Sequence, residues 1–377
     1  MALREIRVLV VDDSAVVRSI IADSIAATPD MKVIATAGDG RQVLEILETA
    51  RPDVITLDIQ MPNMDGLATL DSILARRPIP VIMVSSLTKL GAEITLDALD
   101  RGAVDYLEKP DYGAKTRAAL REELPRKIRA AAGLDVERIL QIRRNRKQRR
   151  AEADKAAAER HLVASRPEKA QAACCPPELA DKCIAIGIST GGPPALAELF
   201  RALRPPLPPI VVVQHMPPSF TRPLAWRLDA LSPLSIKEAA QGDVLQPNHV
   251  LIAPGGKHLQ VRRVGNAVKA VVRDGAPVSG HKPSVDVMML SVVEAFGSGC
   301  LGVIMTGMGR DGANGCRAIR AAGGYVLGQD EATSDVYGMN KVAFVEGHVD
   351  RQFALEDAAA AITLEVHRLR CPAPTVA

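Results

Sequence analysis

Aromatic residues are scarce in this sequence of 377 residues, and it has neither a cysteine motif nor a large excess of one charge sign. Phe, Trp and Tyr together make up 3% of the chain, too few for a base-stacking surface that binds single-stranded nucleic acid. Lys and Arg number 47 and Asp and Glu 44, so the net charge is only +3. This balance argues against a globally basic nucleic-acid binder, and nucleic acid is not an expected partner.

The six cysteines form no CxxC pair, and Cys174 beside Cys175 suits neither a disulfide framework nor a zinc site. The seven histidines show no HxH or HExxH spacing, which also argues against zinc. No signal peptide is recognisable, and no apolar run approaches the roughly 20 residues that a membrane helix needs. We therefore expect a reduced, cytoplasmic protein without membrane insertion.

The length of the chain favours two domains, and its 47% apolar residues suffice for a core in each. Shifts in composition along the chain predict three parts: a first domain at 1–132, a linker at 133–181 and a second domain at 182–370.

In the first domain, apolar runs alternate with helical patterns. The runs are "IRVLVVDD", "KVIATAG", "DVITLD", "VIMVSS" and "DYLEKP", and the helices are predicted at 14–28, 39–50, 65–77, 88–102 and 115–132. Alternation of this kind, with apolar strands, is typical of a parallel sheet covered by helices on both faces. The first domain is therefore predicted to be a small doubly wound α/β domain.

The predicted linker opens with a basic run. Its cations are Arg138, Arg143, Arg144, Arg146, Lys147, Arg149 and Arg150, and no acid lies among them. A stretch rich in Ala, Glu and Lys follows, then one rich in Pro, Ala and Ser, so we expect a partly helical and then looser connection. The basic run is interpreted as a solvated face, with a specific docking site as the alternative.

Alternation resumes at Cys183, with strands "CIAIGIST", "PIVVVQH", "NHVLIAP", "LGVIMT" and "YVLGQD". Helices are predicted at 193–203, 219–231, 285–296 and 312–322. Two further alternating runs around Gly265-Asn266 predict a β-hairpin. The second domain is therefore expected to be a larger doubly wound α/β domain with a hairpin insertion.

Polar side chains gather at the strand ends of the first domain. Asp12 and Asp13 end the first strand, Asp58 the third and Ser85 the fourth, and Lys109 follows the fifth. The carboxyl ends of parallel strands meet at one edge of the sheet, where ligands bind. Carboxylates crowded there repel one another unless a hard cation such as Mg²⁺ lies between them. One such Asp alone could simply cap a helix.

With "VLVVDDS", "ITLDIQMPNMDG", "VIMVSS" and "DYLEKP", this domain resembles the flavodoxin-like receiver domain of two-component response regulators. The resemblance implies phosphorylation of Asp58, with Mg²⁺ held by Asp12, Asp13, Asp58 and the backbone carbonyl of Gln60. It also implies three switch residues, namely the hydroxyl of Ser85, the rotating ring of Tyr106 and the phosphate-binding Lys109.

The turn "GISTGGP" in the second domain could cradle a phosphate, present a nucleophile or simply connect a strand to a helix. It lacks the Lys of a phosphate-binding loop. Ser189, His215 and Asp311 each lie at or just after a strand end, as a serine nucleophile, its base and an orienting acid require. Each also has an ordinary alternative, because His215 could be structural and Asp311 could cap the helix starting at Gly312.

The motifs "AIGISTGGP", "VVQHMPPSFT", "APGGKHL", "KPSVDVMM", "MTGMGRDGA" and "DEATSDVYGM" are similar to the catalytic domain of the chemotaxis protein-glutamate methylesterase family. The resemblance implies a catalytic Ser189, His215 and Asp311. It further implies that Thr190 lies beside the histidine and that the N–H of Met308 contributes to the oxyanion hole.

The same resemblance implies a cytoplasmic serine hydrolase, activated by phosphorylation, that removes methyl esters from receptor glutamates and deamidates receptor glutamines in chemotactic adaptation. Its partners would be methylated chemoreceptors and a chemotaxis histidine kinase as phosphodonor. Mg²⁺ would serve the receiver, and the esterase site would need no cofactor. The alternative is a receiver-controlled regulator that binds an acidic partner or nucleic acid through the basic linker, with a degenerate second domain.

Overall fold

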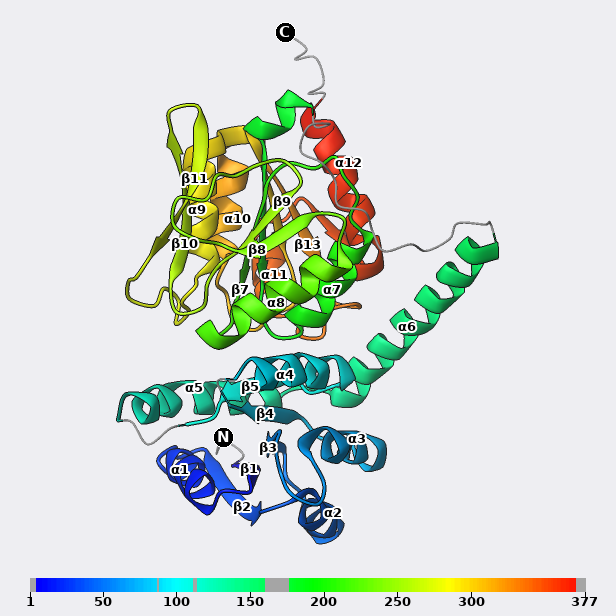
Figure 1. Cartoon of the computed structure of the whole chain (residues 1–377), viewed down its shortest axis with the longest axis vertical. Helices are drawn as coiled ribbons and strands as arrows, with labels where there is room; N and C mark the ends of the chain where they lie inside the picture. Colours follow the sequence, from blue (N-terminus) through cyan, green and yellow to red (C-terminus); the bar gives the residue numbers. More distant parts are fainter. Residues whose placement is uncertain (1–4, 87, 111–113, 160–175, 371–377) are drawn as a thin grey trace. The chain divides into compact units, whose positions relative to one another are not determined.

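The computed structural model describes residues 5–86, 88–110, 114–159 and 176–370. The chain divides after Arg143 into two compact units, each with its own sheet (Figure 1). This division falls within the long helix α6 (Val136–Glu159), which covers the basic run. Residues 160–175 of the predicted linker lie outside the described residues.

The first unit contains a five-stranded sheet with the order β2-β1-β3-β4-β5, and all its strands are parallel. The strands are β1 (Ile6–Val11), β2 (Met31–Ala37), β3 (Val54–Asp58), β4 (Val81–Ser85) and β5 (Asp105–Glu108). This is the strand order of flavodoxin-like folds, in which ligands bind where the order reverses, between β1 and β3.

Five helices cover the faces of this sheet: α1 (Ala15–Ala26), α2 (Gly40–Thr49), α3 (Gly66–Arg76), α4 (Lys89–Arg101) and α5 (Ala114–Ala132). The side chains that cap the first four helices by accepting backbone N–H bonds are Ser14, Asp39, Asp65 and Thr88. Such caps fix where each helix begins after its strand and so hold the strand-end loops in place.

The second unit is built on a seven-stranded parallel sheet with the order β14-β13-β12-β6-β7-β9-β8. Its strands are β6 (Cys183–Ile188), β7 (Ile210–Gln214), β8 (Ser235–Glu238), β9 (His249–Ile252), β12 (Cys300–Ile304), β13 (Tyr325–Gln329) and β14 (Arg351–Phe353). The order reverses between β6 and β12, so the expected crevice lies at the ends of these two strands.

The helices of the second unit are α7 (Gly192–Ala202), α8 (Pro218–Leu231), α9 (Val285–Phe296), α10 (Ala313–Ala321), α11 (Met339–Val345) and α12 (Ala358–Arg370). Short 3₁₀ turns are η2 (Pro177–Asp181), η3 (Gly297–Gly299) and η4 (Leu355–Asp357). Helices α9, α10 and α11 share one apolar cluster with the sheet, whereas α7 and α12 lie together elsewhere on it (Figure 1).

The predicted hairpin is confirmed. Strands β10 (His258–Val264) and β11 (Ala267–Arg273) pair antiparallel along their whole length and close at Gly265-Asn266. One face of the hairpin joins the apolar cluster of α9, because Leu259, Val261, Val268 and Ala270 are all buried there.

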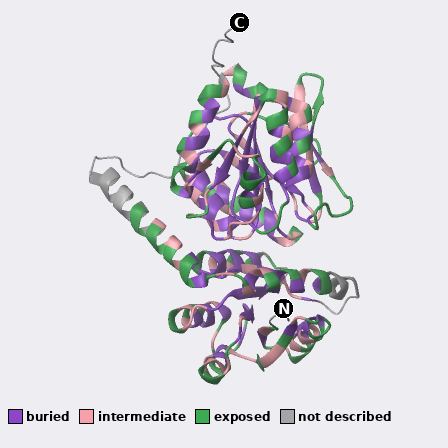
Figure 2. Ribbon diagram, turned by 180° about the vertical axis from the view of Figure 1, so that it is seen from behind, coloured by how far each residue is buried: buried purple, intermediate pink, exposed green. Residues whose placement is uncertain are grey.

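In both units the buried residues are concentrated in the strands and the exposed ones on the outer helix faces (Figure 2). The predicted fold class, two doubly wound parallel-sheet α/β domains with a hairpin insertion in the second, is therefore confirmed. Among the described helices, none combines the length and apolar content that crossing a bilayer requires.

The central strand β12 offers a test of this core. Ile304 is fully buried, so Ile304→Ala should leave a cavity and lower the free energy of unfolding by about 2–5 kcal/mol. The change can be measured by urea titration with the fluorescence of Trp226, the only tryptophan, which lies in α8 of the same unit. Val264→Ala at the exposed hairpin tip is the matched control and should change little. Equal urea midpoints for Ile304→Ala and Val264→Ala would contradict the burial of Ile304 in the core.

Candidate functional site

The acidic residues of the first unit converge on one lysine. Lys109 Nζ lies 2.7 Å from Asp58 Oδ2, 3.1 Å from Asp12 Oδ2 and 3.7 Å from Asp13 Oδ1. One carboxylate oxygen from each of the three aspartates lies within 4.8 Å of the others. The structure thus brings together the strand-end cluster that the sequence predicted.

Burial and mutual repulsion disfavour the charged forms of these acids. Burial, followed by the charge of Asp58, raises the pKa of Asp12 from 3.8 to about 6. Burial also raises the pKa of Asp58, although Lys109 opposes the shift. For Lys109, burial alone would lower the pKa, but its hydrogen bond to Asp58 and the charges of both acids raise it.

One oxygen of this cluster lacks a hydrogen bond. Asp12 Oδ2 is buried and ion-paired with Lys109, yet it accepts no hydrogen bond within the described part of the chain. Asp13 keeps a partly exposed side chain, so the cluster remains open on one side. An all-oxygen donor set with a lone pair left over fits a hard divalent cation.

A cavity of about 560 Å³ adjoins the cluster. Its lining includes Asp13 and Gln60 from the strand-end loops and Met61, Leu67 and Ile94 as apolar walls. Gln60 N also donates to Asp58 Oδ1 at 3.4 Å. A small molecule can therefore reach the acidic cluster from this side.

The two predicted switch residues other than Lys109 are both buried. Ser85 Oγ donates to the carbonyl of Gly91 in α4 at 3.1 Å, so this hydroxyl joins the end of β4 to α4. Tyr106 lies 4% exposed, with Lys127 Nζ 4.8 Å from its ring centroid. Burial raises the pKa of the Tyr106 hydroxyl well above its ordinary value.

The turn after β6 lies against the turn after β12. Ser189 N donates to Thr306 O at 3.0 Å, and Gln214 Nε2 donates to Ser189 O at 2.9 Å. A Cβ atom on Gly307 would lie 2.6 Å from Ser189 Cβ, so only glycine allows this approach. Gly191 begins α7 with a positive φ of 78°, which turns the chain sharply after the serine.

The predicted base and acid are in contact. His215 Nε2 lies 2.8 Å from Asp311 Oδ2, and the other ring nitrogen, Nδ1, has no hydrogen-bond partner among the described residues. Asp311 therefore favours the tautomer with the proton on Nε2 and leaves a basic lone pair on Nδ1. Among these residues Ser189 Oγ makes no hydrogen bond to His215, and such contacts are often loose before substrate binds.

Asp311 does not cap α10, which was the structural alternative. Its carboxylate accepts bonds from Ser284 Oγ at 2.8 Å, Val285 N at 2.7 Å and Asp286 N at 3.1 Å. Burial would raise the pKa of Asp311, but the hydrogen bond and charge of His215 outweigh it and the pKa is lowered. Asp286 instead serves the start of α10, since it accepts bonds from the N–H groups of Gly312 and Gly315.

Thr190 and Met308 flank the serine. The carbonyl of Thr190 accepts a bond from Thr306 Oγ1 at 3.0 Å, which joins the turns after β6 and β12. Met308 directly follows Gly307, the glycine that lies against Ser189, and its side chain is exposed.

Sequence reasoning missed His281 and Ser284. The His281 ring stacks on His215, with centroids 3.7 Å apart and planes within 7°. Ser284 both caps α9 and donates to Asp311. The signal available was a Ser before an apolar helical run, which predicts the cap, but nothing in the spacing showed that this cap faces Asp311.

Comparison with known proteins gives two family matches. The CheB methylesterase model matches residues 184–362, and the response regulator receiver domain model matches residues 8–121. The chain is 43% identical to protein-glutamate methylesterase/protein-glutamine glutaminase 2 of Pseudomonas aeruginosa, over 96% of this chain and 97% of that protein. It is 42% identical to the protein-glutamate methylesterase/protein-glutamine glutaminase of Treponema denticola, over 96% of this chain and 98% of that protein.

The chain belongs to the protein-glutamate methylesterase/protein-glutamine glutaminase family. Among solved structures, it is 37% identical to the CheB methylesterase catalytic domain of Thermotoga maritima, covering 49% of this chain and 98% of that chain at a TM-score of 0.48. The resemblance inferred from the motifs is confirmed for both domains. Membership makes this chain a chemotaxis methylesterase and glutaminase under the control of a receiver domain.

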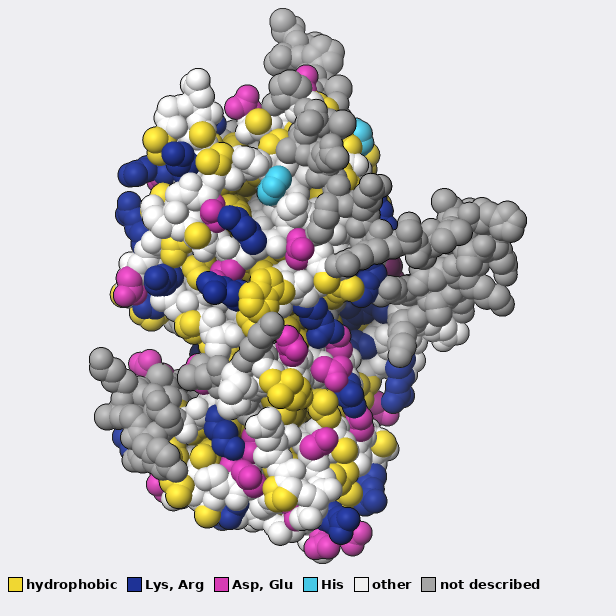
Figure 3. Space-filling view, viewed as in Figure 1, with side chains coloured by type: hydrophobic (Ala, Val, Ile, Leu, Met, Phe, Trp, Pro, Cys, Tyr) yellow, Lys and Arg dark blue, Asp and Glu magenta, His cyan; other side chains and the backbone are white. Residues whose placement is uncertain are grey.

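The alternative of a pure binding regulator is not favoured, because the chain matches the methylesterase model and its relatives are hydrolases by name. On the face visible in Figure 3, cationic and acidic side chains of the described residues are interspersed. A surface for nucleic acid would gather cations instead.

The raised pKa of Asp12 predicts a pH-dependent stability of the first unit. The folded carboxyl has a pKa of about 6 against 3.8 ordinarily, so the folded state binds more protons between these values. Stability should therefore fall as pH rises from about 4 through about 6. Asp12→Asn lacks this penalty, so it should be more stable than wild type near pH 7.5 and equal to it near pH 4.

Calorimetric unfolding of the whole chain, without divalent cations, measures the effect. Asp23→Asn on the exposed face of α1 is the control and should follow wild type at both pH values. A constant difference between Asp12→Asn and wild type across this range would show that Asp12 does not titrate there.

Proposed function

We propose that Ser189 is the nucleophile of this methylesterase, His215 its general base and Asp311 the group that orients the base. The observation that carries the proposal is the 2.8 Å contact of His215 Nε2 with buried Asp311, next to a serine at the point where the sheet order reverses. A buried histidine with only a structural role normally has both ring nitrogens hydrogen-bonded. Nδ1 of His215 is buried but has no hydrogen-bond partner among the described residues.

In the first step, Ser189 Oγ attacks the side-chain carbonyl of the substrate while His215 Nδ1 takes the hydroxyl proton. The oxyanion that develops is stabilised by backbone donors, for which we propose the N–H of Met308, and Thr190 supports the turn. The C–O or C–N bond then breaks, and the proton held by His215 goes to the leaving methanol or ammonia. Asp311 remains ionised and stabilises the imidazolium.

In the second step, water attacks the acyl-enzyme and gives its proton to His215, which returns it to Ser189 Oγ. The product is a free glutamate side chain from either substrate, so one site serves both the methylesterase and the glutaminase activities. These steps use only groups of the chain itself, so no cofactor is needed for them. We propose the glutamate methyl esters and particular glutamines of chemoreceptors as the substrates.

For the first unit we propose that Asp58 accepts a phosphoryl group from the chemotaxis histidine kinase. The O–P bond to Asp58 forms as the N–P bond of the kinase phosphohistidine breaks. Mg²⁺, when held by Asp12, Asp13, Asp58 and the carbonyl of Gln60, would neutralise charge on the phosphoryl oxygens. Lys109 binds the new charge, and Ser85 and Tyr106 are the residues whose rearrangement passes the change on.

The domain limits that accompany this proposal are a receiver at 1–132, a linker at 133–181 and a catalytic domain at 182–370. Phosphorylation at Asp58 then shifts the population of the chain toward its active state. A shift of this kind is bounded by the coupling free energy, typically about 1–3 kcal/mol.

Substitution of the triad gives a direct test. Ser189→Ala should lower kcat by a factor on the order of 10⁶, and Asp311→Asn by a factor on the order of 10⁴, because the amide no longer favours the proton on Nε2. The double variant should be no worse than Ser189→Ala alone. Hydrolysis of a methylated receptor, measured by methanol release, is the assay.

Ser298→Ala, an exposed serine in η3 just before β12 begins, is the matched control and should retain full activity. Near-normal turnover in Asp311→Asn would remove this aspartate from the mechanism, and activity in Ser189→Ala would refute the nucleophile.

Phosphorylation gives a second test. Purified protein should take up label from a phosphorylated kinase or a small acyl phosphate only when Mg²⁺ is present, and esterase turnover should then rise by about 5–150-fold. Asp58→Ala should take up no stable label and show no rise, whereas Asp53→Ala, at the opposite end of β3, should behave as wild type. Stable label on Asp58→Ala would refute this assignment.

A further inference from the structure

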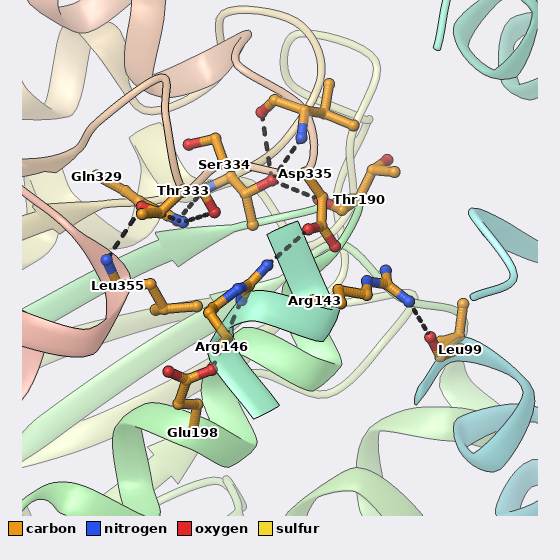
Figure 4. A network of polar contacts seen from close by, with 12 residues as sticks. Leu99, Arg143, Arg146, Thr190, Glu198, Gln329, Thr333, Ser334, Asp335 and Leu355 are labelled. Atoms are coloured by element: carbon orange, nitrogen blue, oxygen red, sulfur yellow. Dashed lines mark hydrogen bonds and ion pairs between the residues drawn. The ribbon is translucent and has the colours of Figure 1, made fainter. Parts of the chain in front are cut away.

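The basic run of α6 is not only a solvated surface. Arg146 Nη2 lies 2.9 Å from Asp335 Oδ1, and Arg146 Nη1 lies 3.6 Å from Glu198 Oε2 (Figure 4). One turn further along α6, Arg149 pairs with Glu356. Two cations of the run therefore have acidic partners within the second unit.

The burial of Arg146 separates it from an ordinary surface ion pair. Its side chain is 10% exposed, and that of Asp335 is 4% exposed. Exposed ion pairs contribute little, whereas a covered guanidinium held between two carboxylates is strongly destabilised when one partner is removed. Arg144, two residues earlier, is exposed by comparison.

The three acids come from separate parts of the unit. Glu198 lies on α7, Asp335 in the loop between β13 and α11, and Glu356 in η4. We call Glu198, Asp335 and Glu356 the acidic seat. No local sequence pattern contains it, since only the tertiary fold brings these segments together.

The acidic seat adjoins the turn that carries Ser189. A Cβ atom on Gly191 would lie 2.7 Å from Asp335 Cβ, so the two backbones are in close contact. Val336 is the next residue, and its N–H donates to Thr306 Oγ1 at 3.0 Å; this hydroxyl donates in turn to Thr190 O at 3.0 Å. The loop that binds Arg146 thus contacts Gly191 directly and Thr190 through Thr306, the two residues that follow Ser189 (Figure 4).

We propose that the basic segment of α6 is an intramolecular ligand of the acidic seat, anchored by Arg146, and that its docking orders the Thr333–Val336 loop beside Ser189. Arg146 is a positioning residue, since it acts through Asp335 and touches no reacting atom. The functional part of this inference rests on Ser189 being the nucleophile, as proposed above. The planar fork of Arg suits two carboxylates at once, which a Lys could not engage equally.

Hydrogen exchange of the full-length chain, read by mass spectrometry, tests the docking. Arg146→Glu should make the amides of 144–159 and of 330–338 exchange about tenfold faster, a loss equivalent to about 1.4 kcal/mol. Asp335→Arg alone should have the same effect. The exchanged pair, Arg146→Glu with Asp335→Arg, should restore protection in both segments.

Arg144→Glu makes the same charge change on the same helix and should alter neither segment. Arg146→Gln provides a second variant without charge reversal and should also lose protection in both. Equal exchange in Arg146→Glu and Arg144→Glu, or failure of the exchanged pair to restore protection, would overturn the proposal.

Esterase kinetics on the same variants test the link to Ser189. Arg146→Glu should lower kcat by about two- to tenfold with KM unchanged, and the exchanged pair should recover it. An unchanged or increased kcat in Arg146→Glu would overturn the link between the acidic seat and the nucleophile turn. Exchange rates do not depend on which residue is the nucleophile, so failure of the docking and failure of the proposed mechanism give different results.

Discussion

The second unit depends on how one buried carboxylate is held. Asp311 has no exposed surface and accepts bonds from Ser284, Val285, Asp286 and His215. Burying a charge in this way is unfavourable unless it is fully hydrogen-bonded, and these donors supply that condition. Three of them come from the start of α9, so the geometry of the histidine depends on where that helix begins.

The segment before α9 therefore does more than connect β11 to the helix. A tight turn joins Val278 to His281, whose ring then covers one face of His215. Ser284 follows and meets Asp311. His215, the proposed base, is held from two directions, by stacking on its ring face and by a hydrogen bond at its edge. Such support from surrounding residues keeps a catalytic group in one orientation before substrate arrives.

Both units collect reactive groups at the carboxyl ends of parallel strands, but their electrostatics differ. In the first unit, burial raises the pKa of Asp12 and Asp58, so charge is disfavoured there until a cation or a modification changes the balance. In the second, His215 lowers the pKa of Asp311 and keeps it ionised. One arrangement suits a switch, and the other suits a site that must be ready for every turnover.

The strands and helices of the first unit, most of those of the second, the hairpin and the residues at the strand ends were predictable from the sequence, whereas β8, β14, α11 and α12 were not predicted. Alternation of apolar runs and helical patterns indicates a doubly wound fold. In such a fold the carboxyl ends of the strands meet at one edge of the sheet, and this brings Asp12, Asp58 and Lys109 together. Ser189, His215 and Asp311 were predicted as a candidate triad for the same reason, since each follows a strand. The family relationship also followed from local motifs.

Contacts between segments that no motif connects could not be predicted, and only the tertiary structure decided them. Which nitrogen of His215 faces Asp311, the stacking of His281 and the role of Ser284 depend on distances between separate elements. The partners of Arg146 are a clearer case, since the sequence showed only a basic run that looked like a solvated surface. Charge patterns along the chain give the sign of a surface, whereas burial and pairing arise only when Glu198 and Asp335 meet in the fold.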